Sequence, residues 1–370
     1  MHFNRKNKVV NQLLKQLTET YQNKTVLLTG HTGFKGAWLA IWLNELGANV
    51  IGYSLDPETK GSLFESAGLQ EKMTDIRGDI RDFAKLKSVF EQYQPDIVFH
   101  LAAQSLVKYS YDYPVYTYDV NVMGTMYVLE AIRQTKSVKA GIFVTSDKCY
   151  ENNEWIWGYR ETDPLGGYDP YSSSKGCCEL LISSYRHSFF PISDYQKHGV
   201  LLASVRAGNV IGGGDWSKDR IVPDCIRALR AKEPIVIRSP QAIRPWQHVL
   251  EPLSGYLLLG TKLYRGETNY AEAWNFGPEP ESITTVEKLV HKIIHSWKSG
   301  SWELATAKPQ VHEATLLSLD ISKAKYHLNW HPKWRIEETV QKTIEWYQQY
   351  RTTDNYDLCV GQIKEYVKES

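Results

Sequence analysis

Short apolar runs alternate with longer stretches of helical periodicity between Lys24 and Arg206. The helical stretches include residues 34–47 and 117–135. Apolar runs of this length, each followed by a helix, are typical of βαβ units whose parallel strands are buried on both faces. We therefore predict an α/β fold built on a doubly wound parallel sheet. The predicted strands lie at residues 25–28, 49–53, 96–100, 140–145 and 200–205, with one more before Gly78.

The alternation weakens after about residue 207, where loops rich in Gly, Pro and Trp appear. We expect a smaller mixed α/β lobe over residues 207–350, which would bind the substrate. It would close over the carboxyl edge of the sheet, where open α/β sheets bind their ligands. The first lobe, residues 24–206, is expected to be completed by a segment near 241–275.

The two ends of the chain lie outside this pattern. Residues 1–23 are predicted to form a helical extension packed on the body, because apolar residues recur there at helical spacing. Those residues are Val10, Leu13, Leu14, Leu17 and Tyr21. Residues 351–370 show little pattern and are expected to be a C-terminal tail, either a last helix or a loose segment.

Composition narrows the class of protein. The 370 residues are 42% hydrophobic and 23% charged, the profile of an ordinary globular protein. The net charge of +1 predicts no attraction to nucleic acid or to an anionic membrane. The five cysteines show neither metal-ligand spacing nor a disulfide framework. With no signal-like or membrane-spanning stretch visible, we expect a cytoplasmic protein without a metal site.

A glycine-rich word joins the first predicted strand to the first predicted helix: Thr29-Gly30-His31-Thr32-Gly33-Phe34-Lys35-Gly36. A dinucleotide site needs glycines there, because the chain turns sharply and the backbone must approach the pyrophosphate. The helix N-terminus would then meet the phosphate charge. We predict a Rossmann-type cofactor cradle at 30–36, with a plain turn as the alternative. Thr32 and Phe34 are assigned to it, and Lys35 would touch phosphate or be solvated.

Further cofactor contacts are predicted where later strands end. Asp56 would bind the ribose hydroxyls and favour NAD over NADP, or serve only as a turn residue. Asp79 and Ile80 would lie near the adenine. Small residues after the strand at 96–100 would let the cofactor approach the backbone, and Asn121 follows in the next helix. The residues of that small stretch are Leu101, Ala102, Ala103 and Gln104.

Tyr171 and Lys175 are four residues apart on a predicted helix, so they share a face. A tyrosine has a reference pKa of ~10, so its ionisation near neutrality needs roughly 4 kcal/mol of help. The Lys175 ammonium and a positively charged nicotinamide would supply this help. The phenolate would then take a proton from a sugar hydroxyl while a hydride leaves the adjacent carbon.

The word Thr145-Ser146-Asp147-Lys148-Cys149-Tyr150 ends the strand at 140–145. Ser146 would hydrogen-bond the hydroxyl that is oxidised. Asp147 and Lys148 would supply an acid and a base that titrate together. An exposed ion pair at a capped strand end is the plainer interpretation, and the nearby Tyr171 favours the catalytic one.

Several long sequence motifs resemble those of a known protein family. They lie at 30–36, 145–150, 154–161, 206–216 and 244–249, the last two being Arg-Ala-Gly-Asn-Val-Ile-Gly-Gly-Gly-Asp-Trp and Arg-Pro-Trp-Gln-His-Val. Over about residues 24–350 the chain resembles the extended short-chain dehydrogenase/reductase family. Within it, the chain is most similar to the nucleotide-sugar 4,6-dehydratases that act on CDP-glucose.

The resemblance implies a hydro-lyase with bound NAD. Tyr171 would start the oxidation of sugar carbon 4, water would leave across carbons 5 and 6, and the hydride would return to carbon 6. Asp147 would help the 6-hydroxyl to leave. The relatives that act on dTDP-glucose carry Asp-Glu at this place, so the base would fall on Lys148, a residue of different charge type. The product, CDP-4-keto-6-deoxyglucose, would feed deoxysugar and O-antigen-type lipopolysaccharide synthesis.

The resemblance also implies the substrate contacts and the assembly. Asn209, Arg220 and Arg244 would hold the substrate pyrophosphate, with help from His248. The family generally pairs through two long helices, so a homodimer or a higher homo-oligomer is expected. Three alternatives remain open: a nucleotide-sugar 4-epimerase, a dehydratase of another nucleotide sugar, and a regulatory protein that senses NAD(P) without chemistry.

Overall fold

A seven-stranded parallel sheet forms the centre of the first lobe in the computed structural model of the chain, which describes residues 13–306 and 316–368. The strand order is β11-β6-β5-β4-β1-β2-β3. The order reverses between β1 and β4, which creates the crevice that open α/β sheets use for ligands. The strands are β1 (Thr25–Thr29), β2 (Asn49–Ser54), β3 (Thr74–Arg77), β4 (Ile97–His100), β5 (Ala140–Val144), β6 (Leu201–Ala207) and β11 (Ala273–Phe276).

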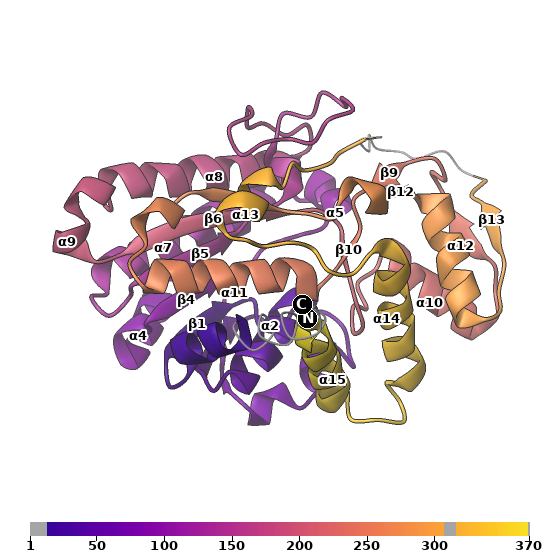
Figure 1. Cartoon of the computed structure of the whole chain (residues 1–370), viewed down its shortest axis with the longest axis horizontal. Helices are drawn as coiled ribbons and strands as arrows, with labels where there is room; N and C mark the ends of the chain where they lie inside the picture. The colour runs from indigo at the N-terminus through magenta and orange to yellow at the C-terminus, as the bar shows by residue number, and fades with distance from the viewer. Residues whose placement is uncertain (1–12, 307–315, 369–370) are drawn as a thin grey trace, which may run out of the picture.

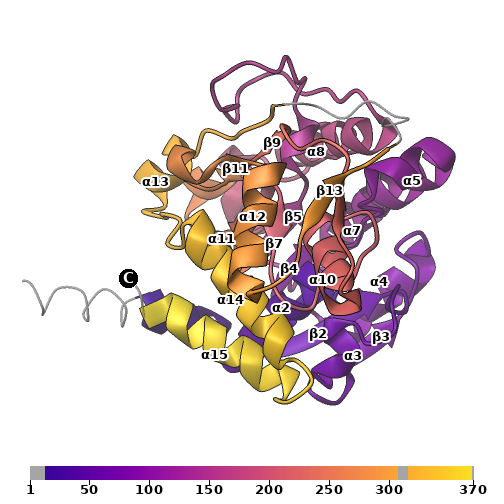
Figure 2. The same ribbon diagram turned by 90° about the vertical axis from the view of Figure 1, so that its right-hand side faces the viewer.

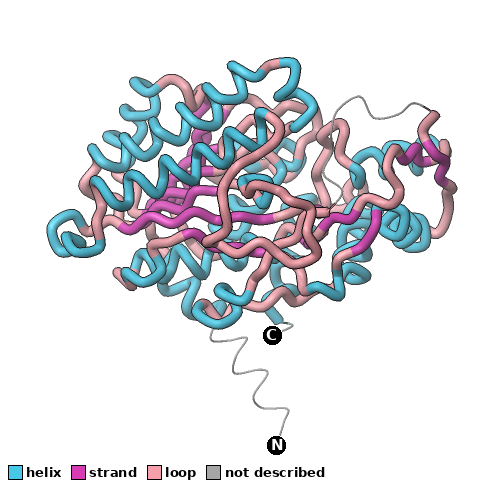
Figure 3. The backbone as a smooth tube through the Cα atoms, turned by 90° about the horizontal axis from the view of Figure 1, so that it is seen from above, coloured by secondary structure: helices cyan, strands magenta, loops and turns pink. Residues whose placement is uncertain are grey.

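Both faces of the sheet are buried, as the apolar runs predict. Within β1, Val26 and Leu28 face one hydrophobic core, and Leu27 faces the other. One face is covered by α2 (Phe34–Glu45) and α11 (Leu250–Tyr264). The other is covered by α4 (Phe83–Tyr93), α7 (Gly124–Gln134) and α8 (Pro170–Ser188). Figure 3 shows the strands between these layers of helices. The predicted α/β class is therefore confirmed.

One predicted helix is divided. The stretch expected at 117–135 consists of α6 (Pro114–Tyr118), a π-helical turn (Asp119–Met123) and α7. A π turn holds an extra residue and often lies at a functional site. Here it contains Asn121, whose buried side chain is used by the loop after β4.

The second lobe gathers at the other end of the molecule (Figure 1). Its main helices are α10 (Ile221–Ala231), α12 (Val286–Trp297) and α14 (Ile336–Gln349). Three small sheets accompany them: β7 (Val210–Ile211) with β10 (Gln247–His248), β9 (Ile243–Arg244) with β12 (Thr284–Thr285), and β8 (Ile235–Ile237) with β13 (Trp302–Leu304).

The chain crosses between the lobes more than once. After the second lobe has begun, α11 packs on β5 and β6, and β11 extends the first sheet beside β6. The segment expected near 241–275 therefore contributes α11 and the start of β11. Shorter helices complete the described fold: α3 (Leu63–Ser66), α5 (Val107–Asp112), α9 (Tyr195–His198) and α13 (Ser322–His327).

The first and the last of the described helices both pack on the first lobe. Residues 13–21 are helical, and the Tyr21 hydroxyl donates to the Leu257 carbonyl at 2.8 Å. Val10, which belongs to the same expected helix, lies outside the described residues. The segment expected as a tail contains α15 (Asn355–Lys368), which packs against α2, the helix of the glycine-rich word (Figure 2). The Tyr366 ring lies 6.0 Å from the ring of Trp42.

Candidate active site

The glycine-rich word forms a tight turn between β1 and α2. Gly30 has φ +77°, and a Cβ added to it would lie 2.7 Å from the Ala102 nitrogen. A Cβ on Gly36 would lie 2.1 Å from the Gly30 carbonyl oxygen, so α2 packs directly on the turn. Gly33, the N-cap of α2, meets that oxygen only at 3.4 Å. The free space at Gly33 lies on the side where a ligand would meet the helix N-terminus.

These contacts separate two glycine variants. We expect Gly36→Ala to cost about 1–3 kcal/mol of unfolding free energy, because the methyl group overlaps the Gly30 carbonyl. Gly33→Ala has room in the fold and is expected to keep the stability but to weaken dinucleotide binding. Urea unfolding and a fluorescence titration with NADH check both results. Equal loss of stability in the two variants would contradict this assignment.

The Thr32 side chain is hydrogen-bonded to the end of β2. Its hydroxyl lies 2.8 Å from the Ser54 hydroxyl and 3.0 Å from the Leu55 carbonyl, so it ties the turn to the end of β2. Asp56 lies just beyond, with 88% of its side chain exposed and 3.6 Å from the Arg77 guanidinium. A carboxylate in this place is accessible to a ribose, and its role stays a prediction.

The other predicted cofactor residues line the neighbouring strand ends. Asp79 forms an ion pair with Arg81, and hydrogen bonds from Arg81 hold the Asp79 pKa below its ordinary value. Ile80 is buried, and a Cβ on Gly124 would overlap it. The Leu101 and Ala102 nitrogens both lie 3.2 Å from the Thr29 hydroxyl. Ala103, like these two, is only partly buried, which leaves this backbone accessible from the crevice.

Asn121 supports this loop from behind. Its side-chain oxygen accepts from the Gln104 nitrogen at 2.9 Å, and its amide donates to the Gln104 carbonyl at 3.0 Å. The same amide donates to the Ser174 hydroxyl on α8 at 2.8 Å. Asn121 therefore connects the cofactor side of the crevice to the helix that carries Tyr171.

Tyr171 and Lys175 lie at the start of α8. Asp169 caps this helix by accepting from the Ser172 nitrogen, and Pro170 occupies its first turn. The Lys175 ammonium donates to the Val144 carbonyl at 3.2 Å, and burial lowers its pKa. Burial raises the pKa of Tyr171 to about 12, and a hydrogen bond with Ser146 opposes this rise.

The word after β5 lies beside Tyr171. The Ser146 hydroxyl donates to Asp147 Oδ1 at 3.0 Å and accepts from the Lys148 nitrogen at 3.1 Å. Asp147 Oδ2 is buried without a hydrogen-bond partner and would lie 3.1 Å from a Cβ on Gly208. Burial raises the pKa of Asp147, although Lys148 and Arg244 oppose the rise. Asp147 is therefore suited to hold a proton.

Cations surround this group. Burial, together with the charges of Arg220 and Lys175, lowers the pKa of Lys35 to about 8, although the Asp147 charge opposes this shift. Arg220 donates to Asp215 Oδ2 and to the Ser105 hydroxyl, each at 3.0 Å. Arg220 thus bridges the two lobes at the mouth of the crevice. Phe34 touches the same region from α2, since a Cβ on Gly212 would lie 3.2 Å from its ring.

Two predicted substrate residues differ in their placement. Asn209 is partly buried between β6 and β7, and its carbonyl accepts from the Gln247 nitrogen at 3.0 Å. His248 is not brought to the site, because its fully buried ring packs against the rings of Trp38 and Trp334 at 5.9 and 4.7 Å. The His248 ring therefore has no exposed surface in this structure, and its help in substrate binding stays a prediction.

Some residues around the site were not predicted from the sequence. Asp215 and Ser105 hold Arg220, and the Tyr256 ring lies 5.9 Å from the Lys35 ammonium. Asp215 follows three glycines, which is a signal for a functional loop acid. Tyr256 lies in an apolar helix that gives no such signal.

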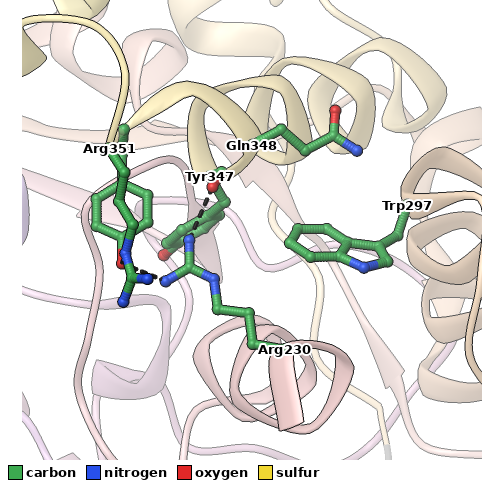
Figure 4. A pocket seen from close by; sticks show the side chains of 6 residues that line it. Arg230, Trp297, Tyr347, Gln348 and Arg351 are labelled. Atoms are coloured by element: carbon green, nitrogen blue, oxygen red, sulfur yellow. Dashed lines mark hydrogen bonds between the residues drawn. The ribbon is translucent and has the colours of Figure 1, made fainter. Parts of the chain in front are cut away.

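A separate pocket of about 440 Å³ opens between α10, α12 and α14 (Figure 4). Arg230 crosses it and donates to the Tyr347 carbonyl at 2.8 Å and to the Tyr350 hydroxyl. These bonds join α10 to α14 and so hold the second lobe together. None of the predicted site residues lines this pocket.

Among residues 13–306 and 316–368, no group of His, Cys, Asp and Glu side chains is arranged to hold a metal ion. Within the same residues, no helix is both long and apolar enough to span a membrane.

A family model described as GDP-mannose 4,6 dehydratase matches residues 27–343. The chain belongs to this dehydratase family. Its resemblance to a CDP-glucose 4,6-dehydratase of Salmonella typhimurium reaches 51% identity over 339 residues, covering 92% of the chain and 94% of that relative. A dTDP-glucose 4,6-dehydratase of Xanthomonas campestris is 26% identical over 87% of the chain and 93% of its own length.

Solved structures confirm the fold of this dehydratase-family chain. The dTDP-glucose 4,6-dehydratase of Bacillus anthracis superposes with a TM-score of 0.73 at 21% identity, covering 91% of this chain and 99% of that one. The UDP-glucose 4-epimerase of Thermotoga maritima gives 0.73 at 23% identity, covering 88% and 99%. At these identities the likeness shows the fold alone, which dehydratases and epimerases share.

Proposed function

We propose that this chain is an NAD-dependent CDP-glucose 4,6-dehydratase, a hydro-lyase that forms CDP-4-keto-6-deoxyglucose. The observation that carries the proposal is the 51% identity to the Salmonella enzyme over 92% of the chain. The described site agrees with it, because Tyr171, Asp147 and Lys148 lie together beside the glycine turn.

NAD is the cofactor of this family, and the residues present fit it. The turn at Gly30, Gly33 and Gly36 leaves room only at Gly33 for a phosphate at the α2 N-terminus. Asp56 is exposed where the adenosine ribose would lie, and the backbone at Leu101 and Ala102 is accessible. When bound, NAD supplies a temporary acceptor for the hydride of sugar carbon 4.

Oxidation at carbon 4 would begin with Tyr171. Its phenolate would take the proton of the 4-hydroxyl, while Ser146 holds that hydroxyl in place. The Lys175 ammonium stabilises the phenolate by its positive charge. The Arg220 charge nearby favours the anionic phenolate over the neutral phenol, whereas the Asp147 charge opposes this effect.

Elimination of water would then depend on Asp147 and Lys148 in the turn after β5. A ketone at carbon 4 acidifies the hydrogen on carbon 5, and Lys148, as the neutral amine, would remove it as a proton. Asp147, whose pKa burial raises, would donate a proton to the departing 6-hydroxyl. Arg220, Arg244 and Asn209 would hold the substrate pyrophosphate at the crevice mouth, as charge-assisted hydrogen bonds allow.

We expect the ionisation of Tyr171 to depend on the cofactor. The pKa of its phenol, about 12 in the cofactor-free protein, should fall when the positive nicotinamide is bound. Because the phenolate is the active base, the hydride step should accelerate as pH rises through this lowered pKa. The phenolate absorbance of the protein minus that of Tyr171→Phe, titrated with and without NAD, measures the shift. An unchanged midpoint would contradict the proposed base.

Two further proposals concern the oligomeric state of the protein and its cellular compartment. We infer a cytoplasmic homodimer or higher homo-oligomer, because all five cysteines are free and apolar side chains are exposed on α6, on α8 and in the segment after α8. These side chains are Val115, Leu180, Phe189 and Ile192. Leu180→Glu should lower the sedimentation mass if this face pairs two subunits, and an unchanged mass would refute that interface. The product of the proposed reaction, CDP-4-keto-6-deoxyglucose, would serve deoxysugar and O-antigen-type lipopolysaccharide synthesis.

Turnover of a nucleotide-sugar panel tests the function. CDP-, dTDP-, GDP- and UDP-glucose are each incubated with the protein, and the ketone product is followed by its absorbance in alkali. We expect a signal with CDP-glucose and no net NADH. Preference for another sugar would name another dehydratase, and inversion at carbon 4 without water loss would name an epimerase. Dinucleotide binding without any turnover would favour a regulatory protein.

A further inference from the structure

The proposed mechanism leaves one buried ion pair without a role. Glu179 on α8 and Arg206 on β6 lie 2.8 Å apart, and their side chains are only 1% and 3% exposed. Burial favours the protonated carboxyl, but the Arg206 charge and three side-chain hydrogen bonds outweigh it, so the pKa of Glu179 stays below its ordinary value. Burying two charges is costly, and such a pair is weak evidence for stability. Its hydrogen bonds show what it holds instead.

The carboxylate holds the start of the catalytic turn. Thr145 donates its hydroxyl proton to Glu179 Oε1, and Thr145 immediately precedes Ser146. The other oxygen, Oε2, accepts from Arg206 and from the Ser204 hydroxyl at 2.7 Å. Ser204 lies within β6 and does not adjoin the turn.

The guanidinium holds the end of the same turn. Arg206 donates to the Tyr150 hydroxyl at 2.7 Å, and Tyr150 follows Cys149 directly. The Tyr150 hydroxyl donates in turn to Asn275 Oδ1 at 2.7 Å, on β11. The Arg206 guanidinium also lies over the Tyr150 ring, 4.8 Å from its centroid.

Both ends of the segment 146–149 are therefore tied to one ion pair. This segment contains Asp147 and Lys148. Inside it, Lys148 donates its backbone N–H to the Ser146 hydroxyl and Cys149 donates to the Ser146 carbonyl, and from outside it the Gly166 N–H donates to the Cys149 carbonyl at 2.8 Å. Glu179 also shares a helix face with Tyr171 and Lys175, since the three are spaced by four residues. The Glu179–Arg206 pair thus connects the turn to α8, the helix that carries the proposed base Tyr171.

We propose that the Glu179–Arg206 pair is a positioning clamp, which fixes Asp147 and Lys148 relative to Tyr171. The inference rests on the proposed function for the identity of the reaction. Elimination needs an acid and a base aligned with two neighbouring carbons, and a displacement on the order of 1 Å can cost about 100-fold in rate. Glu179 and Arg206 are almost fully buried and bind the two ends of the turn, so they would act through the turn.

The test removes single hydroxyl groups and keeps the ion pair. Thr145→Val and Tyr150→Phe each release one end of the turn. We expect each to lower kcat by about 10- to 100-fold, with KM for CDP-glucose and the affinity for NADH unchanged. Thr145→Ser, which keeps the hydroxyl, should restore kcat. Ser204→Ala is the matched control, because it removes a hydrogen bond to the same carboxylate and should leave kcat near that of the wild type.

Two results would overturn the clamp. One is a kcat of Thr145→Val no lower than that of Ser204→Ala, and the other is a Thr145→Ser variant as slow as Thr145→Val. Wild-type turnover of CDP-glucose is read separately and decides the proposed function. Hydrogen exchange at the 146–149 amides tests the clamp without any activity: Thr145→Val should accelerate it and Ser204→Ala should not. Equal exchange in both variants would also refute it.

Discussion

Tyr171→Phe is expected to lower turnover of CDP-glucose by about 100- to 10,000-fold, the range for loss of a general base. The ring fills the same buried position beside Ser146, so the fold should persist. Without the phenolate, the 4-hydroxyl keeps its proton and the hydride cannot leave carbon 4. A single-turnover experiment with enzyme-bound NAD should therefore show no transient NADH absorbance.

Tyr326→Phe is the control for this experiment, since Tyr326 is an exposed tyrosine on α13. It should turn over CDP-glucose at the wild-type rate. If Tyr171→Phe kept more than about a tenth of that rate, another group would have to accept the proton, since a general base is worth at least about 100-fold.

Asp147→Asn and Lys148→Met should separate elimination from oxidation. Both variants keep Tyr171 and Lys175, so NADH and a 4-ketone should still form. Loss of water should fall by about 100- to 10,000-fold in each, because each lacks one of the two proton-transfer groups. Accumulation of reduced cofactor with CDP-4-ketoglucose, measured by absorbance and mass spectrometry, checks the prediction.

Exchange at carbon 5 divides the two roles. In deuterated water, Asp147→Asn should still exchange the carbon-5 hydrogen, because Lys148 remains as the base. Lys148→Met should not exchange it. The rate of water loss should fall as pH rises through the pKa of Asp147, because the proton donor is then lost. Since burial raises this pKa, the donor persists to higher pH than an ordinary carboxyl would. Exchange that survives in Lys148→Met would move the base to another residue.

The sheet and the cradle could be predicted because both are local patterns. Buried strands such as β1 require apolar residues on both faces, and the turn at Gly30 and Gly36 admits no side chain. The shared face of Tyr171 and Lys175 follows from the helix repeat. These features depend on neighbours in sequence.

The features that the sequence did not predict depend on contacts between distant segments. His248 stands four residues after Arg244, but the turn through Trp246 buries it between Trp38 and Trp334. The buried positions of α15 include the polar residues Asn355 and Gln362 and are covered by α2, α3 and α14, so the segment shows little pattern by itself. The Glu179–Arg206 pair joins residues 27 positions apart, and nothing along the chain marks them as partners.

One isotope measurement tests whether the hydride removed from carbon 4 returns to carbon 6 of the same sugar. CDP-glucose with deuterium at carbon 4 is converted by the protein without added NAD, and the product is examined by NMR. We expect the deuterium to appear at carbon 6 of CDP-4-keto-6-deoxyglucose. Deuterium in free NADH, or its retention at carbon 4, would contradict it.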